Sequence, residues 1–192
     1  HVIPAETSDT REDHGLPRVG IVFCAFNAPT KIDPETFASW MAILVQVPDS
    51  VLWLRAHTDA TTLNLQEAAR ERGVDPARLV FAPLMPSMDA HMARHRHADL
   101  FLDTFVYGAH STAADAIAMG LPVLTLAGRA MPARVGASLC HAYGLSDLIA
   151  DTSQDYVEIA VAHARDPELL HMRRTELAAK LPMQRDSAAF AQ

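Results

Sequence analysis

The sequence predicts an α/β fold, in which a Rossmann-like, doubly wound parallel sheet carries helices on both faces. Short apolar runs alternate with amphipathic segments at least four times, which is typical of successive strand–helix–strand crossovers. The 192 residues are 49% hydrophobic and 20% charged, which is sufficient for one domain with a sizeable core. We expect an arm or linker over residues 1–18, one lobe over 19–181 and a tail over 182–192.

The first strand and the first helix have the clearest signals. Residues 19–26 are apolar throughout, as in a central strand buried on both faces. Asp33 is a good N-cap, and Pro34 fits the first turn of the helix that follows it. The apolar positions of this helix recur at helical spacing. They are Phe37, Trp40, Met41, Leu44 and Val45.

Two further strands are expected, at residues 51–54 and 79–82. The helix between them begins at Thr61 or Thr62, either of which could cap it. It ends before Gly73, a residue type that readily adopts the left-handed conformation found at helix C-termini.

The next unit has the order strand, loop, helix, strand. Residues 100–102 form a short buried strand, and a turn covers 107–109. Ser111 or Thr112 caps the helix that follows, and residues 120–122 end it and begin the last clear strand. The remaining expected elements are a helix over 87–96, a helix near 132–143, a short segment over 145–150, and helices over 153–165 and 167–180.

The helix that opens at Ser111 predicts an anion site. It begins just beyond the carboxyl end of a strand, so its free N–H groups and positive dipole end point at one spot that suits phosphate. His110, Ser111 and Thr112 gather at this spot, and Asp115 lies one turn further on. A carboxylate behind an anion site fits a ribose hydroxyl better than a phosphate. The alternative is a capped helix with an incidental histidine.

Two other loops are expected at the same edge of the sheet, where the strand order reverses. Lys31 follows the first strand and could reach a diphosphate as a point charge, although it could also be an ordinary surface lysine. His91 and Arg94 lie on a cation-rich helix, where Arg94 could meet a nucleobase or a phosphate. His91 and His95 are one turn apart but lack a third ligand, so no metal is expected there. A solvated helix face is the alternative for His95 and Arg96.

Composition excludes several classes of function. A net charge of -7 argues against a general nucleic-acid or membrane-surface binder. Two cysteines, Cys24 and Cys140, make neither a disulfide framework nor a zinc set, and they favour a reducing, cytoplasmic setting with Cys24 as an inert core thiol. No apolar run approaches the roughly 20 residues of a membrane helix. A Walker motif and a complete dinucleotide fingerprint are both missing.

Several motifs occur in order along most of the chain. They are Phe23–Asn27, Lys31–Pro34, Val47–Leu54, Leu102–Thr104, Gly108–Thr112, Gly120–Val123 and Ala133–Val135. Together they resemble the carboxyl-terminal lobe of protein O-linked N-acetylglucosamine transferases, over about Val19 to Lys180. This resemblance implies a GT-B architecture, in which two Rossmann-like lobes enclose the donor and the second lobe holds most of it. Tetratricopeptide repeats usually precede the two lobes.

The resemblance also implies an activity and two catalytic residues. N-acetylglucosamine would pass from UDP-GlcNAc to a serine or threonine hydroxyl, leaving UDP as product, with no cofactor and no metal. Lys31 resembles the lysine that meets the donor diphosphate, and His110 resembles the histidine near the sugar and the phosphate. The departing diphosphate would be stabilised by Lys31 and by the helix N-terminus.

The same resemblance assigns the other donor contacts. His91 and Arg94 match the residues on the uracil side, allowing for one inserted residue just before His91. Ser111 and Thr112 resemble the Thr-Thr pair whose N–H groups and hydroxyls hold the diphosphate. Asp115 matches the carboxylate that binds the ribose.

The chain departs from the family pattern in three respects. Ala28 stands where animal members carry a glutamine, and Arg129 replaces an acid after the fifth strand. The amino-terminal catalytic lobe, which carries the acceptor-side histidine, and the last helix are missing from the sequence, so we expect the isolated chain to be inactive. The expected partners are a UDP-sugar donor, a protein or peptide acceptor, and that missing lobe with its repeats.

Two alternatives remain at this stage. The lobe could use another nucleotide sugar, such as GDP-fucose or UDP-glucose. It could also be a non-catalytic nucleotide-binding or scaffold module that has kept the fold.

Overall fold

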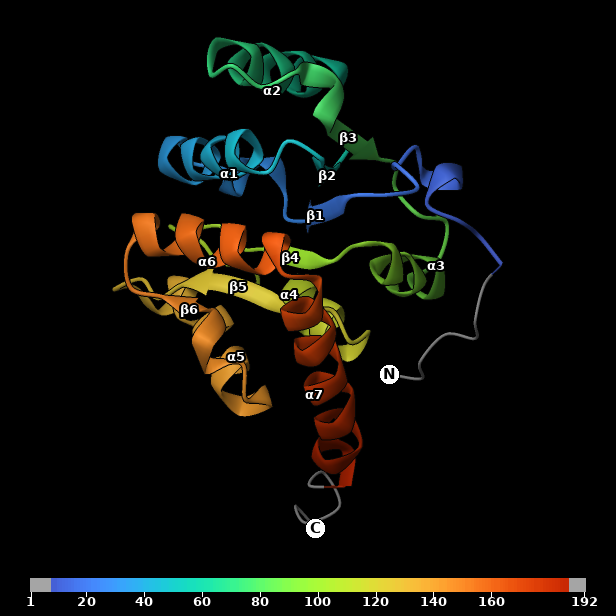
Figure 1. Cartoon of the computed structure of the whole chain (residues 1–192), viewed down its shortest axis with the longest axis vertical. Helices are drawn as coiled ribbons and strands as arrows, with labels where there is room; N and C mark the ends of the chain where they lie inside the picture. Colours follow the sequence, from blue (N-terminus) through green and yellow to red (C-terminus); the bar gives the residue numbers. More distant parts are fainter. Residues whose placement is uncertain (1–7, 187–192) are drawn as a thin grey trace.

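A six-stranded parallel sheet forms the centre of the molecule (Figure 1). The computed structural model describes residues 8–186, so residues 1–7 of the predicted arm and 187–192 of the predicted tail lie outside the described part. The strand order is β3-β2-β1-β4-β5-β6, and every neighbouring pair is parallel. The strands are β1 (Ile21–Ala25), β2 (Ser50–Arg55), β3 (Leu79–Ala82), β4 (Leu100–Leu102), β5 (Val123–Leu126) and β6 (Ile149–Ala150).

The order of the strands reverses between β1 and β4. The chain first builds outward from β1 to β3, then crosses back and continues outward from β4 to β6. Phe23 pairs with Leu52 of β2 on one side and with Leu100 of β4 on the other, and all three are fully buried. The loops after β1 and β4 therefore diverge and leave a crevice at the carboxyl edge of the sheet, where ligands bind in folds of this kind. The predicted fold class is confirmed.

Helices cover both faces of this sheet. They are α1 (Pro34–Gln46), α2 (Asp59–Glu71), α3 (Met88–Ala93), α4 (Ser111–Ala118), α5 (Val135–Tyr143), α6 (Ser153–Arg165) and α7 (Pro167–Asp186). Short 3-10 turns are η1 (Glu12–His14), η2 (Pro29–Lys31), η3 (Pro76–Arg78), η4 (Arg94–His97), η5 (Met131–Ala133) and η6 (Ser146–Leu148). Figure 1 shows α6 beside α1, and the two helices are in contact. In the described part of the chain, no helix combines the length and apolar character needed to cross a membrane.

The residues at which the helices begin differ from several of the predictions. Asp33 caps α1 as expected, accepting hydrogen bonds from the backbone N–H groups of Glu35 and Thr36. For α2 the prediction was wrong, because Thr58 is the cap and the helix begins at Asp59. The helix expected over 87–96 is an α-helix only to Ala93 and then tightens into η4. The one expected near 132–143 begins as η5 and becomes α-helical at Val135.

The inner face of α1 also differs from the prediction. Val45 is 54% exposed, whereas Ile43 is fully buried in the core. Helix α1 contacts α6 as well as β2, so its buried face is wider than a stripe that faces the sheet alone. Ile43 therefore replaces Val45 in the apolar face.

The described part of the predicted arm packs against the lobe. Arg11 forms two hydrogen bonds to the Asp99 carboxylate, at 2.9 and 2.8 Å, and one to the Gly20 carbonyl. Asp99 also accepts a hydrogen bond from the Val22 N–H at 2.7 Å, so the arm is fixed to the start of β1. Leu16 is only 3% exposed and belongs to the core. At the other end, α7 runs to Asp186, beyond the predicted start of the tail.

Candidate functional site

Lys31 lies at the end of η2, in the loop that follows β1. Its Nζ donates a hydrogen bond to the Gly108 carbonyl at 3.0 Å and stands 4.4 Å from the centre of the Tyr107 ring. Both partners belong to the turn after β4, so Lys31 and His110 lie at the same edge of the sheet, as predicted. Burial lowers the pKa of Lys31, and the nearby Asp103 carboxylate opposes that shift.

His110 is held beside this turn. Its ring stacks on Tyr107, with 5.1 Å between the ring centres. Its Nε2 lies 3.1 Å from the Pro132 carbonyl oxygen, which can only accept, so Nε2 carries a proton. In the neutral imidazole Nδ1 is then the acceptor. This arrangement fixes both the position and the tautomer of the ring.

The N-terminus of α4 has no side-chain cap from any described residue. The N-cap position is His110, so the prediction that Ser111 or Thr112 caps this helix was wrong. Instead, the Thr112 hydroxyl donates to the Asn27 Oδ1 at 2.7 Å. A helix end whose N–H groups lack a side-chain acceptor is suited to an anion.

Asn27 is a site residue that the sequence analysis missed. It is only 3% exposed and follows directly after the buried residue Phe26. Its Nδ2 donates to the Thr104 hydroxyl at 3.2 Å, while its Oδ1 receives the hydrogen bond from Thr112. A polar residue that ends an apolar strand is the only local signal that could have identified it.

A cavity of about 210 Å³ opens next to the α4 N-terminus. Its lining residues come from the loop after β1, from β2, from the loop after β3, and from α3, η4 and α4. They are Phe26, Arg55, Pro83, Leu84, Met88, His91, Arg94, Ser111, Thr112 and Asp115. The fold therefore brings together five of the seven predicted site residues in this cavity, while Lys31 and His110 lie at the neighbouring turn.

Arg94 and His91 form the polar wall of this cavity. The Arg94 guanidinium lies 3.9 Å from the centre of the Phe26 ring and donates to the Pro83 carbonyl and to the His91 Nδ1, at 3.1 and 2.8 Å. Because arginine only donates, the His91 proton is on Nε2, which lies 3.8 Å from an Asp115 carboxylate oxygen. Burial and the Arg94 charge lower the pKa of His91 to about 4, so this ring is neutral at pH 7.

His95 is part of the core. It is fully buried, and its Nδ1 donates to the backbone carbonyls of His91 and Met92 at 3.0 and 3.1 Å. Burial lowers the pKa of His95 to about 3. The solvated helix face considered for this residue is therefore wrong.

Asp103 organises the turn that follows β4. Its carboxylate is 1% exposed and accepts hydrogen bonds from the Thr104 N–H, the Ala109 N–H and the Thr125 hydroxyl, at 2.7, 2.6 and 2.8 Å. A Cβ at Gly136 would lie 2.5 Å from the same carboxylate, so only glycine fits there. Burial raises the pKa of Asp103 to about 6. This residue holds the loop that presents Gly108 and His110.

Comparison with known proteins agrees with this geometry. The sequence model of glycosyl transferase family 41 matches residues 3–191. The chain belongs to glycosyl transferase family 41. A family 41 relative from Caenorhabditis elegans, a UDP-N-acetylglucosamine--peptide N-acetylglucosaminyltransferase, is 36% identical over 168 residues, which is 88% of this chain and 14% of the relative.

Two solved structures show which fold this part of a family 41 protein has. A mutant of the Thermobaculum terrenum O-GlcNAc transferase superposes with a TM-score of 0.82 and 34% identity, covering 85% of this chain and 32% of that one. The C-terminal domain of a group 1 glycosyl transferase from Francisella tularensis has a TM-score of 0.69 at 15% identity, covering 94% of this chain and 95% of that domain. The architecture is therefore that of a GT-B lobe, and the chain spans only a part of its family 41 relatives.

Proposed function

We propose that this chain is the donor-binding lobe of a protein O-GlcNAc transferase, which transfers N-acetylglucosamine from UDP-GlcNAc to serine or threonine hydroxyls. One observation carries the proposal. The Lys31 ammonium and the uncapped N-terminus of α4 meet at the reversal of strand order, beside a cavity with polar walls. A nucleoside diphosphate has the charge and the length to occupy both places.

The base and the ribose would lie in the cavity. Arg94 and neutral His91 offer hydrogen-bond donors to the carbonyl groups of a uracil, and Phe26 supports the guanidinium from behind. Asp115, whose carboxylate lies 3.8 Å from the His91 Nε2, would accept from a ribose hydroxyl. Ser111 and Thr112 would then lie next to the phosphates.

The chemistry of this lobe would be stabilisation of the leaving group. When the bond between the sugar C1 and the diphosphate oxygen breaks, that oxygen gains negative charge. Lys31 and the N–H groups at Ser111 and Thr112 would stabilise this charge without a metal ion, and His110 would lie near the sugar and the phosphate. The acceptor hydroxyl would be activated from the second lobe, which also completes the cleft.

Calorimetry with UDP and GDP tests the proposal. The chain is expected to bind UDP and to prefer it over GDP. A preference for GDP would replace the donor with a GDP-sugar, and failure to bind either nucleotide would favour a scaffold module.

The other parts of the proposal concern partners and location. The chain alone should not glycosylate a peptide, because the acceptor side of the cleft comes from the other lobe. Transfer by the purified chain from UDP-GlcNAc would contradict this expectation. A protein acceptor, an amino-terminal lobe with tetratricopeptide repeats and a cytoplasmic location complete the proposal, the last in keeping with the free thiols of Cys24 and Cys140.

A further inference from the structure

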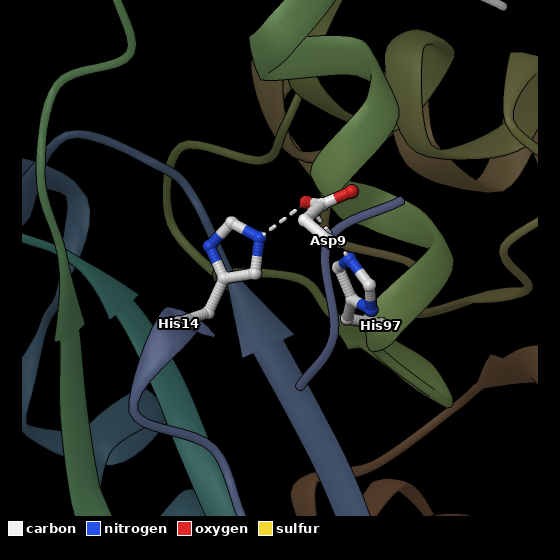
Figure 2. A group of neighbouring side chains, drawn as sticks. All are labelled: Asp9, His14 and His97. Carbon is white, nitrogen blue, oxygen red and sulfur yellow. Dashed lines mark hydrogen bonds and ion pairs between the residues drawn. The ribbon is translucent and has the colours of Figure 1, made fainter. Parts of the chain in front are cut away.

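Two imidazoles and one carboxylate meet at the arm (Figure 2). The Nε2 atoms of His14 and His97 lie 2.7 and 3.1 Å from the same Asp9 carboxylate oxygen. The two rings are tilted against each other, with 4.8 Å between their centres. One ligand atom from each residue lies within 4.8 Å of the others.

The three residues come from two segments and are largely shielded. Asp9 and His14 belong to the arm, where His14 ends η1, and His97 ends η4. Their side chains are 30%, 12% and 7% exposed, in that order. His97 lies just before β4, whereas Lys31 and His110 follow the carboxyl ends of strands. The cluster therefore includes none of the predicted donor-site residues, and its His14 ring packs against Trp53 of β2.

We propose that Asp9, His14 and His97 form a binding site for a late first-row divalent cation, of which Zn²⁺ is the best match. Imidazole nitrogens with one carboxylate oxygen are a usual zinc ligand set, and a water completes the tetrahedron. Bonds of about 2.0–2.1 Å at tetrahedral angles place neighbouring donor atoms about 3.3 Å apart. The nitrogen–oxygen separations here are 2.7 and 3.1 Å, so each of these two pairs needs to widen by less than an ångström, and one nitrogen of each ring lies within 4.8 Å of the other.

The directions of the side chains suit a metal ion. The two imidazoles already direct their ε-nitrogens at one oxygen, so a cation entering among them would meet three donor atoms. Once bound, the cation would tie the arm to the crossover between β3 and β4, next to the Arg11–Asp99 ion pair.

Titration of the metal-free full chain with Zn²⁺ and Mg²⁺ tests the proposal. We expect one tight Zn²⁺ site per chain and no comparable Mg²⁺ site, because Mg²⁺ prefers an all-oxygen octahedral shell. Asp9→Asn removes the charge of the carboxylate ligand, and His14→Phe and His97→Gln each remove an imidazole nitrogen, so each variant should bind zinc about tenfold more weakly or worse. The matched controls are His171→Phe and His171→Gln, at an exposed position on α7.

Two further measurements distinguish the loss of a metal ligand from the loss of folded structure. Circular dichroism and thermal unfolding report whether each variant is folded, and His14→Phe keeps a ring against Trp53. Zn²⁺ should raise the unfolding temperature of the wild type and of the His171 variants but not that of His14→Phe. Equal zinc affinity in all six proteins, or an equal rise in unfolding temperature, would mean adventitious binding to other histidines and would overturn the proposal.

Discussion

Thr112 and Asn27 are joined by a hydrogen bond of 2.7 Å across the boundary between β1 and β4. Asn27 continues the connection to the Thr104 hydroxyl, which in turn donates to the Tyr107 carbonyl at 2.7 Å. The start of α4, the loop after β1 and the turn after β4 are thus linked by buried and half-buried side chains. The proposed anion site would therefore be held in place before any ligand binds.

Replacing Asn27 should destabilise the lobe. Asn27→Ala leaves the half-buried Thr112 hydroxyl without its acceptor and removes one of the two partners of the buried Thr104 hydroxyl, at a cost of about 1–3 kcal/mol in the free energy of unfolding. Urea denaturation measures this change. The control is Asn64→Ala at the chain's only other asparagine, which is exposed on α2 and should change stability by less than about 0.5 kcal/mol. Equal stability of the two variants would show that the connection contributes nothing.

Lys31→Ala should weaken UDP binding by about 1.5–3 kcal/mol, the range for hydrogen bonds that involve a charged group. The physical reason is that Lys31 supplies the positive charge at the predicted diphosphate position. Lys180→Ala removes the chain's only other lysine, on α7, and should leave the affinity unchanged. Calorimetry decides the matter, since an unchanged affinity in Lys31→Ala would refute the site assignment while leaving the fold intact.

Asp115→Ala should weaken UDP binding by about 1 kcal/mol, which is less than the effect of Lys31→Ala. The reason is that the ribose hydroxyl that Asp115 would bind is neutral. The assignment to the ribose is tested by comparing UDP with its 2′-deoxy and 3′-deoxy analogues. Wild-type protein should bind at least one analogue more weakly, and Asp115→Ala should not distinguish that analogue from UDP. If the variant discriminates as strongly as the wild type, Asp115 does not contact the ribose. Asp89→Ala, at an exposed position of α3, is the control.

Asp103 should make the free energy of unfolding fall as the pH rises, which is the opposite of the usual effect of a buried, hydrogen-bonded carboxylate. Its pKa rises from 3.8 to about 6 on folding, so the folded state holds the proton more tightly than the unfolded state. Protonation therefore favours folding, and this contribution falls as the pH rises from about 4 to 6, by up to about 3 kcal/mol. The difference in unfolding free energy between wild type and Asp103→Asn should decrease across that window. A difference that stays constant or grows would contradict the raised pKa.

Much of the fold could be predicted because local signals agree with the tertiary structure. The apolar runs at 79–82 and 100–102 are bounded by polar turns, and both are strands with those bounds. The start of α2 was less predictable because Thr58, Thr61 and Thr62 are all competent caps. The path of the chain from β2 selects the first of them, and Thr58 accepts from the Thr61 N–H at 3.1 Å.

Long-range contacts account for the remaining differences. The sequence could predict that His91, Arg94 and Asp115 lie at one edge of the sheet, because the carboxyl ends of parallel strands meet at the same edge. It could not reveal Asn27, whose two partners lie 77 and 85 positions further along the chain. The same applies to Asp9 and His97, which are 88 positions apart and meet only because the arm folds back.

The packing of Trp53 gives the chain an internal optical reporter. Its indole lies 5.2 Å from the His14 ring on one side and 5.0 Å from the Phe26 ring on the other, measured between ring centres. His14 belongs to the histidine cluster at the arm, whereas Phe26 lines the cavity beside α4. The emission of this one fluorophore should therefore report on changes in the arm cluster and in the cavity, and replacing Trp40, the other tryptophan, leaves a single signal to follow.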